Sequence, residues 1–197
     1  MSLTLAIMAG GKSSRMGTDK SFVTLLGKPL IEHLLDRLAD LGEDERILIT
    51  NRPDDYVALG LPMFPDVLPE KGSLGGIYTA ITHSQSDYTL VIACDMPFAN
   101  PALLKYMIGL CDGSYDVIVP RVDNYPEGLH AIYKQTCLAP IRKLLDADQL
   151  KVMGFYGDVR VRYLDEAEYQ PFDAKGLSFF NVNTPHELEE ARRLAGE

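Results

Sequence analysis

The sequence contains no tryptophan, only three cysteines and no hydrophobic run long enough to span a membrane. Cys94, Cys111 and Cys137 are odd in number and show no C-x-x-C spacing, which argues against a disulfide framework and against a zinc site. No basic segment precedes the first short apolar stretch, so no signal peptide is indicated. We therefore expect a cytoplasmic protein that makes no membrane contact.

Cations are also scarce, because 19 lysines and arginines stand against 28 acidic residues and the formal net charge is −9. Duplex binding depends on clustered cations that neutralise phosphates, so this balance argues against nucleic acid as a partner. A small anionic ligand remains compatible, since a local cluster of cations can oppose the overall charge. Such a cluster lies near the N-terminus and includes Arg15 and Lys20.

Strand-like and helix-like segments alternate along the chain. Near-continuous apolar runs predict buried strands, and apolar residues at helical spacing predict helices. The expected strands cover residues 3–9, 46–50, 88–95, 115–120, 129–134 and 158–164, and the expected helices cover 29–41, 75–84, 101–111, part of 136–147, and the region after Thr184. The start of the last helix is marked by Thr184 as the N-cap, Pro185 at the first helical position and Glu187 three residues after the cap. This alternation indicates a three-layer α/β/α sandwich with a mostly parallel, Rossmann-like sheet, built as a single domain over residues 1–197. In such folds ligands bind beyond the carboxyl ends of the strands.

The stretch "IMAGGKSSRMGTDK" at residues 7–20 follows the first expected strand. It is not a P-loop, because Ala6 occupies the position of the first glycine of G-x-x-x-x-G-K-[ST], and Lys12 breaks the G-x-G-x-x-G pattern. Adjacent glycines still allow close approach of the backbone to an anion. Arg15 offers a planar fork for phosphate oxygens, and Lys20 offers a compact charge. The alternative is a tight turn with solvated cations.

Asp95, in "CDMPF" at residues 94–98, ends the strongest expected strand at the edge where ligands bind. A carboxylate there is suited to hold Mg²⁺ against substrate phosphates. The alternative is a helix cap or a turn residue. Asn51 and Asp66 follow strands or loops at the same expected edge, where they can bind a base or a ribose, although each alone is also typical of a turn.

No side-chain nucleophile is evident beside these candidates. The four histidines show no metal-ligand spacing, and no G-x-S-x-G element is present. Phosphoryl and nucleotidyl transfer need neither, because positioning and neutralisation of charge supply most of the catalysis. The sequence therefore favours that reaction class.

The segment "MAGGKSSRMGTDK" is similar to the L-A-G-G-x-S-x-R-M-G-x-D-K signature of the molybdenum cofactor guanylyltransferases, the MobA family, which have a glycosyltransferase-A-like nucleotidyltransferase fold. Further blocks resemble the family in its order: "ITNRPDDY", "PDVLPEKGSLGGIYTAI", "CDMPF", "EGLHAIYK" and "FFNVNTPHELEEA". The resemblance covers essentially the whole chain. It implies transfer of GMP from GTP to the phosphate of molybdopterin, with Mg²⁺ required and pyrophosphate released.

The resemblance also implies roles for individual residues. The family's nucleotide contacts fall on Met8, Ala9, Gly10, Lys20, Asn51, Asp66 and Asp95. Asp95 matches the magnesium ligand, and Arg15 and Lys20 would neutralise the triphosphate during attack. Asn181 and Asn183 match a segment near the metal and the second substrate. Candidates for transient protein contacts are other cofactor-biosynthesis proteins and the apo-molybdoenzymes.

Two departures from the family pattern keep alternatives open. Met8 replaces the usual leucine, and the block usually written G-P-L-A-G reads Gly72-Ser73-Leu74-Gly75-Gly76, which we expect to loosen a loop and affect guanine recognition. The alternatives are a cofactor cytidylyltransferase that uses CTP, a sugar-phosphate nucleotidyltransferase, and a non-catalytic GTP-binding relative. Gly10 favours GTP, since the cytidylyltransferases tend to carry L-A-A-G there.

Overall fold

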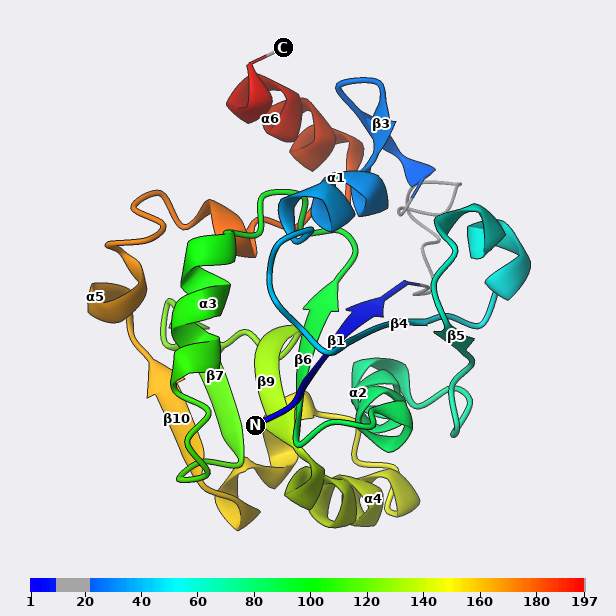
Figure 1. Ribbon diagram of the computed structural model, residues 1–197, viewed down its shortest axis with the longest axis vertical. Coiled ribbons are helices and arrows are strands. Elements are labelled where there is room, and N and C mark those ends of the chain that lie inside the picture. Colours follow the sequence, from blue (N-terminus) through cyan, green and yellow to red (C-terminus); the bar gives the residue numbers. More distant parts are fainter. Residues whose placement is uncertain (10–21, 197) are drawn as a thin grey trace.

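The computed structural model describes residues 1–9 and 22–196, and its centre is a twisted mixed sheet (Figure 1). The order of strands across the sheet is β10-β7-β9-β6-β1-β4-β5, and the short strand β8 pairs with β7. The strands are β1 (Leu3–Met8), β4 (Glu45–Ile49), β5 (Met63–Phe64), β6 (Tyr88–Ala93), β7 (Val117–Val122), β8 (Tyr125–Pro126), β9 (His130–Lys134) and β10 (Val161–Leu164). A separate hairpin joins β2 (Thr24–Leu25) to β3 (Lys28–Pro29).

Helices cover both faces of the sheet, which confirms the three-layer α/β/α prediction. The main helices are α1 (Leu30–Arg37), α2 (Gly72–His83), α3 (Pro101–Gly109), α4 (Leu138–Asp146) and α6 (Pro185–Ala195). Apolar residues of α1 and α3 pack on one face with Leu5 and Ile7, whereas those of α2 and α4 pack on the other face with Ala6. Side chains alternate between the two faces of a strand, so a strand covered on both sides is apolar at every position. None of the helices within the described ranges is both long and apolar enough to cross a bilayer.

Strand β9 runs against its neighbours, whereas the β4–β1–β6 pairings are parallel. Its register with β6 runs from Tyr88 opposite Lys134 to Ile92 opposite His130. Because partners on antiparallel strands have opposite sequence directions, the start of β9 lies at the carboxyl end of β6. The turn before β9 is therefore brought to the edge where ligands are expected.

The C-terminal helix α6 begins as its sequence predicts. Thr184 accepts a hydrogen bond from the backbone N–H of Glu187 at 3.2 Å, and the carboxylate of Glu187 accepts the N–H of Asn183 at 2.7 Å. This exchange resembles a capping box shifted back by one residue. The helix packs on the β2–β3 hairpin through a small apolar cluster that includes Val182.

Several predicted boundaries differ from the observed ones. The helix predicted for 29–41 is shorter, because Pro29 pairs in β3 and the helical geometry ends after Arg37. Short elements that carry no periodic signal were not predicted: the hairpin β2–β3, β5, β8, the short helix α5 (Glu166–Tyr169), and the 3-10 helices η2 (Pro53–Leu59), η3 (Gln135–Cys137), η4 (Val152–Asp158) and η5 (Leu177–Phe179). Two-residue strands offer too few positions for alternation to be recognised.

Candidate nucleotide and metal site

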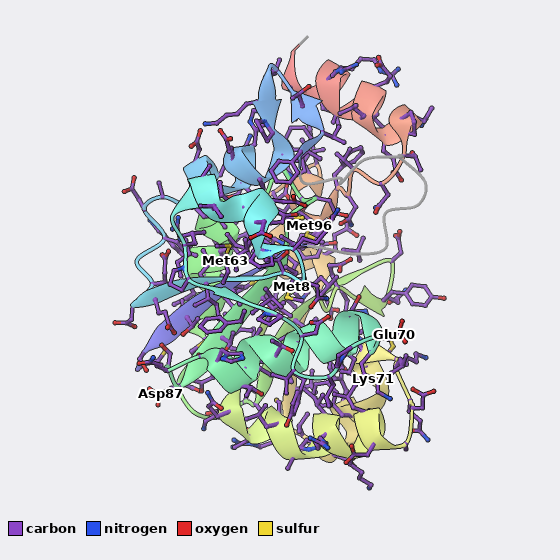
Figure 2. The ribbon with its side chains drawn as sticks, turned by 90° about the vertical axis from the view of Figure 1, so that its right-hand side faces the viewer. Met8, Met63, Glu70, Lys71, Asp87 and Met96 are labelled. Atoms are coloured by element: carbon purple, nitrogen blue, oxygen red, sulfur yellow. The ribbon has the colours of Figure 1, made fainter. Side chains whose placement is uncertain are left out.

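The carboxyl ends of β4, β1 and β6 are joined by backbone hydrogen bonds. Ala9 donates to the carbonyl of Ile49 at 2.9 Å, and Cys94 donates to the carbonyl of Met8 at 3.1 Å. Asn51, Met8 and Asp95 thus follow or end three adjacent strands. Figure 2 shows Met8 above helix α2, between that helix and Met96. This edge of the sheet, from Asn51 to Asp95, is called the site rim below.

Asn51 and Asp66 form a reciprocal pair at one end of the site rim. The side-chain amide of Asn51 donates to Oδ2 of Asp66 at 2.8 Å, and its carbonyl oxygen accepts the backbone N–H of Asp66 at 2.9 Å. Asn51 is exposed and Asp66 is half-buried. Each residue was also compatible with an isolated turn from sequence alone, but the two hold each other in one orientation and present polar atoms to the rim.

Gly76 brings helix α2 close to Met8 and Asp66. A Cβ atom built on Gly76 would overlap the terminal methyl group of Met8 and would lie 3.8 Å from Oδ1 of Asp66. At the preceding position, a Cβ on Gly75 would lie 2.6 Å from Cβ of Lys71. Gly76 therefore allows α2 to approach β1, and Gly75 leaves room for the side chain of Lys71 at the start of the same helix.

The prediction that residues 72–76 form a loosened loop is wrong. These residues are the first positions of α2, and Leu74, Gly75 and Gly76 are buried. Intrahelical hydrogen bonds and burial restrain their backbone. The absence of the proline found in the family pattern therefore does not loosen a loop here, because these residues are helical. The N-terminus of α2 instead lies beside the rim, with Glu70 and Lys71 immediately before it (Figure 2).

Asp95 lies just beyond the end of β6, at the other end of the site rim. The residue as a whole is half-buried, and the Oδ1 atom of its side chain is buried. Its carbonyl accepts the backbone N–H of Val182 at 2.9 Å. The backbone of Asp95 is therefore fixed at the edge where ligands bind in such sheets.

Val182 stands between Asn181 and Asn183, so the Val182–Asp95 hydrogen bond brings both asparagines next to the Asp95 backbone. The side-chain amide of Asn181 donates to the carbonyl of Phe179 at 3.1 Å, and both asparagines are half-buried. The structure thus places this segment beside the backbone of Asp95, at the site rim. Of the other predicted residues, Met8 and Ala9 end β1 or follow it, whereas Gly10, Arg15 and Lys20 lie outside the described residues.

The oxygen donors at Asp95 fit a magnesium ion. Mg²⁺ prefers oxygen ligands, retains several waters and is usually held by one or two carboxylates together with substrate phosphates. Within residues 1–9 and 22–196, no group of three or more histidine, cysteine, aspartate or glutamate side chains forms a complete metal cage. A magnesium site made of one or two carboxylates together with substrate phosphates is therefore compatible with the site rim.

Two residues of the β8–β9 region were missed as site candidates. Glu127 is half-buried, and burial first, then the negative charge of Asp95, raises the pKa of its carboxyl group. His130 is fully buried, and burial lowers its pKa to about 4. Neither ring nitrogen of His130 hydrogen bonds within the described part of the chain. The sequence block "EGLHAIYK" predicts a strand and resembles a block of the family, but neither feature shows which strands pack beside it.

Comparison with known proteins gives consistent matches over nearly the full length. The family model for the MobA-like NTP transferase domain matches residues 5–159. A probable molybdenum cofactor guanylyltransferase of Natranaerobius thermophilus is 34% identical over 200 residues, which cover 99% of this chain and 97% of that protein. A protein of the same description from Pelotomaculum thermopropionicum is 36% identical over 192 residues, with coverages of 98% and 93%.

Among solved structures, molybdopterin-guanine dinucleotide biosynthesis protein A from Archaeoglobus fulgidus has a TM-score of 0.85 and 27% sequence identity. The match covers 98% of each chain. The similarity therefore includes the strands that form the site rim and the C-terminal segment that docks on it.

Proposed function

Because the chain belongs to the MobA-like NTP transferase family, we propose that it transfers GMP from GTP to the phosphate of molybdopterin, as a molybdenum cofactor guanylyltransferase. We propose that residues 1–197 act together as one nucleotidyltransferase domain. The relatives at 34% and 36% identity carry that activity in their names.

One observation carries the proposal: the Asn51–Asp66 pair and the Asp95 carboxylate lie on the same rim, after strands separated by β1 alone. Adjacent strands lie about 4.8 Å apart, so the two groups are separated by roughly 10 Å across the sheet. A nucleotide spans such a distance between its base or ribose and its α-phosphate. The pair would read the nucleoside, and Asp95 would lie beside the reacting phosphate.

The reaction requires no general base from the protein. An oxygen of the acceptor phosphate, already an anion, attacks the α-phosphorus of GTP in line with the leaving group. The new bond is the P–O bond of the dinucleotide, and the bond between the α-phosphorus and the β-bridging oxygen breaks, so its electron pair leaves with pyrophosphate. Charge stabilisation and alignment then account for most of the rate.

The residues divide these tasks. Asp95 would hold Mg²⁺, which neutralises charge on the phosphates and aligns the leaving group when it is bound. Arg15 and Lys20, assigned from the sequence, would bind triphosphate oxygens. Met8, Ala9 and Gly10 would approach the nucleotide through the backbone, and Asn181 and Asn183 would face the acceptor.

Calorimetric titration of the protein with GTP and with CTP, each with Mg²⁺, tests the nucleotide. GMP transfer from α-labelled GTP to molybdopterin tests the reaction. Selective GTP binding with formation of the dinucleotide supports the proposal, and preference for CTP would assign a cytidylyltransferase instead. GTP binding without transfer or pyrophosphate release would indicate a non-catalytic relative.

A further inference from the structure

Residues 172–183, which lie between α5 and α6, run beside the turn that follows β6. Figure 1 shows this segment passing the start of α3 before it reaches α6. Its last part is fixed to the site rim, because the N–H of Val182 donates to the carbonyl of Asp95. It also carries Asn181 and Asn183, the residues proposed to face the acceptor. This segment is called the C-terminal strap below.

The first turn of the strap is folded by its own residues. Asp173 is buried, and its two carboxylate oxygens accept the backbone N–H groups of Leu177 and Ser178 at 3.0 and 2.6 Å. Gly176 has a left-handed backbone with φ of 65°, and its N–H donates to the carbonyl of Asp173 at 3.0 Å. The turn therefore keeps its shape through local contacts, whereas its position on the domain depends on contacts with other elements.

Asn100, the last residue before α3, makes two of those contacts. Its side-chain amide donates to the carbonyl of Phe172 at 2.7 Å, and its backbone N–H donates to Oγ of Ser178 at 3.2 Å. Ser178 is fully buried and Asn100 is half-buried. The segment from Asp95 to Asn100 is therefore hydrogen bonded to the strap at both of its ends.

Asn100 also caps helix α3, and this second task uses a different atom. Its Oδ1 accepts the N–H groups of Ala102 and Leu103 at 2.8 and 3.4 Å, as expected for an N-cap residue. An aspartate caps a helix equally well but, when ionised, has no hydrogen to donate. Capping therefore accounts for the oxygen of the amide and leaves the contact between its nitrogen and Phe172 to be explained.

Apolar contacts hold the strap on the core without fixing it at one position. Phe179 packs edge to face against His130, with ring centroids 5.0 Å apart, and Phe180 packs in the same way against Phe98 at 6.0 Å. Hydrophobic attraction is non-directional, so such contacts tolerate small shifts. A hydrogen bond weakens steeply when it is misaligned. The polar contacts of Asn100 therefore determine where the strap lies.

We propose that Asn100 is a positioning residue for GMP transfer, because it fixes the C-terminal strap relative to Asp95. This inference rests on the proposed function for the roles of Asn181 and Asn183, whereas the placement of the strap is measurable without it. The hydrogen bond of Val182 alone would let the strap pivot, and the two contacts of Asn100 remove that freedom. In-line attack is sensitive to such a shift, since a displacement of about 1 Å can cost about 100-fold in rate.

The variant N100D separates the two tasks of this residue. It retains the cap of α3 and removes the amide that binds the carbonyl of Phe172, whereas N100A removes both. S178A removes the hydroxyl group of the other contact, and K175A, at an exposed position of the same strap, is the control. Hydrogen exchange of the Val182 amide, followed by NMR, measures the anchoring of the strap. Transfer assays give kcat and the KM for molybdopterin, calorimetry gives the Kd for GTP, and thermal unfolding checks the fold.

We expect the Val182 amide to exchange about tenfold faster in N100D than in the wild type, because a directional contact of the strap is lost. The kcat for GMP transfer should fall about tenfold with the Kd for GTP unchanged. S178A should show the same pattern to a smaller extent, K175A should match the wild type, and N100A should also melt at a lower temperature than N100D.

Wild-type exchange of the Val182 amide in both N100D and S178A would overturn the inference. Wild-type transfer by a variant with a loosened strap would overturn it too, as would an equal loss of GTP affinity, because a residue that positions the acceptor leaves GTP bound as before. If these variants loosen the strap but the wild-type protein transfers no GMP, placement of the strap by Asn100 stands and the proposed function fails.

Discussion

The backbone N–H of Val182 donates to the carbonyl of Asp95 at 2.9 Å, so the C-terminal segment is anchored on the residue that ends the central strand. Next to Val182, the N–H of Asn183 is bound by Glu187 of α6. The start of α6 is thereby linked to the site rim through two successive hydrogen bonds. Asn183, proposed to face the acceptor, and Asp95, proposed to hold the metal, are consequently positioned by one continuous connection.

Substitution of Asp95 by asparagine should abolish most GMP transfer and leave the fold intact. Asparagine has a similar shape but lacks the charge that would bind Mg²⁺, and we expect the rate to fall about 1000-fold. Steady-state transfer with saturating GTP and Mg²⁺ measures the effect, and thermal unfolding checks the fold. D40N, which alters an exposed aspartate, is the control. Full activity of D95N would disprove a metal role for this residue.

The Asn51–Asp66 pair should act as a unit in nucleotide binding. We expect N51A and D66A each to raise the Kd for GTP by about tenfold, because loss of either partner leaves the other without its hydrogen bonds. The double variant should be little worse than either single one, which is the result expected for coupled residues. Calorimetry measures all three, with exposed Q149A as the control. Additive losses would mean that the residues bind independently.

A methyl group at Gly76 should disturb the rim through Met8. In G76A the new Cβ occupies the position of the Met8 methyl group, which must move. We expect GTP binding to weaken about tenfold and stability to fall by about 1 kcal/mol, since overpacking offsets the better helix propensity of alanine.

The double variant M8A/G76A checks the mechanism, because shortening Met8 removes the overlap and should restore much of the GTP affinity. G109A is the matched control, since a Cβ on Gly109 meets no atom within 4 Å. Equal loss of affinity in the single and double variants would show that Met8 does not transmit the effect.

Buried His130 should make stability depend on pH. Burial lowers its pKa to about 4, whereas the unfolded chain binds a proton near pH 6.5. Stability is therefore fully present above pH 6.5 and decreases as the pH falls toward 4. Between pH 7 and 5 the loss should be about 2 kcal/mol, measured by urea unfolding.

H130L removes the titrating ring and fills a similar apolar volume, so its free energy of unfolding should vary much less over that range. The variant H186A alters an exposed histidine and should keep the wild-type dependence. The same slope in H130L and the wild type would assign the pH dependence to other groups.

Much of the architecture could be predicted because it depends on local patterns. Residues 3–9 and 88–95 are apolar at successive positions, which is typical of strands covered on both faces, and both form central strands. Thr184, Pro185 and Glu187 predicted the start of α6 from capping chemistry alone. Asp95 was placed at the ligand-binding edge because it follows such a strand.

The sequence alone thus determined which segments form the main strands and helices and which polar site candidates follow those strands. It also determined the reaction class for which these candidate residues are suited. Tertiary structure decided which candidates meet: Asn51 with Asp66, Gly76 with Met8, and Asp95 with Val182. It also reversed β9, and that reversal brings the turn before β9 to the site rim. The physical reason is that side-chain periodicity specifies the face on which a residue lies, whereas its neighbour depends on strand order and register, which are set by packing between distant segments.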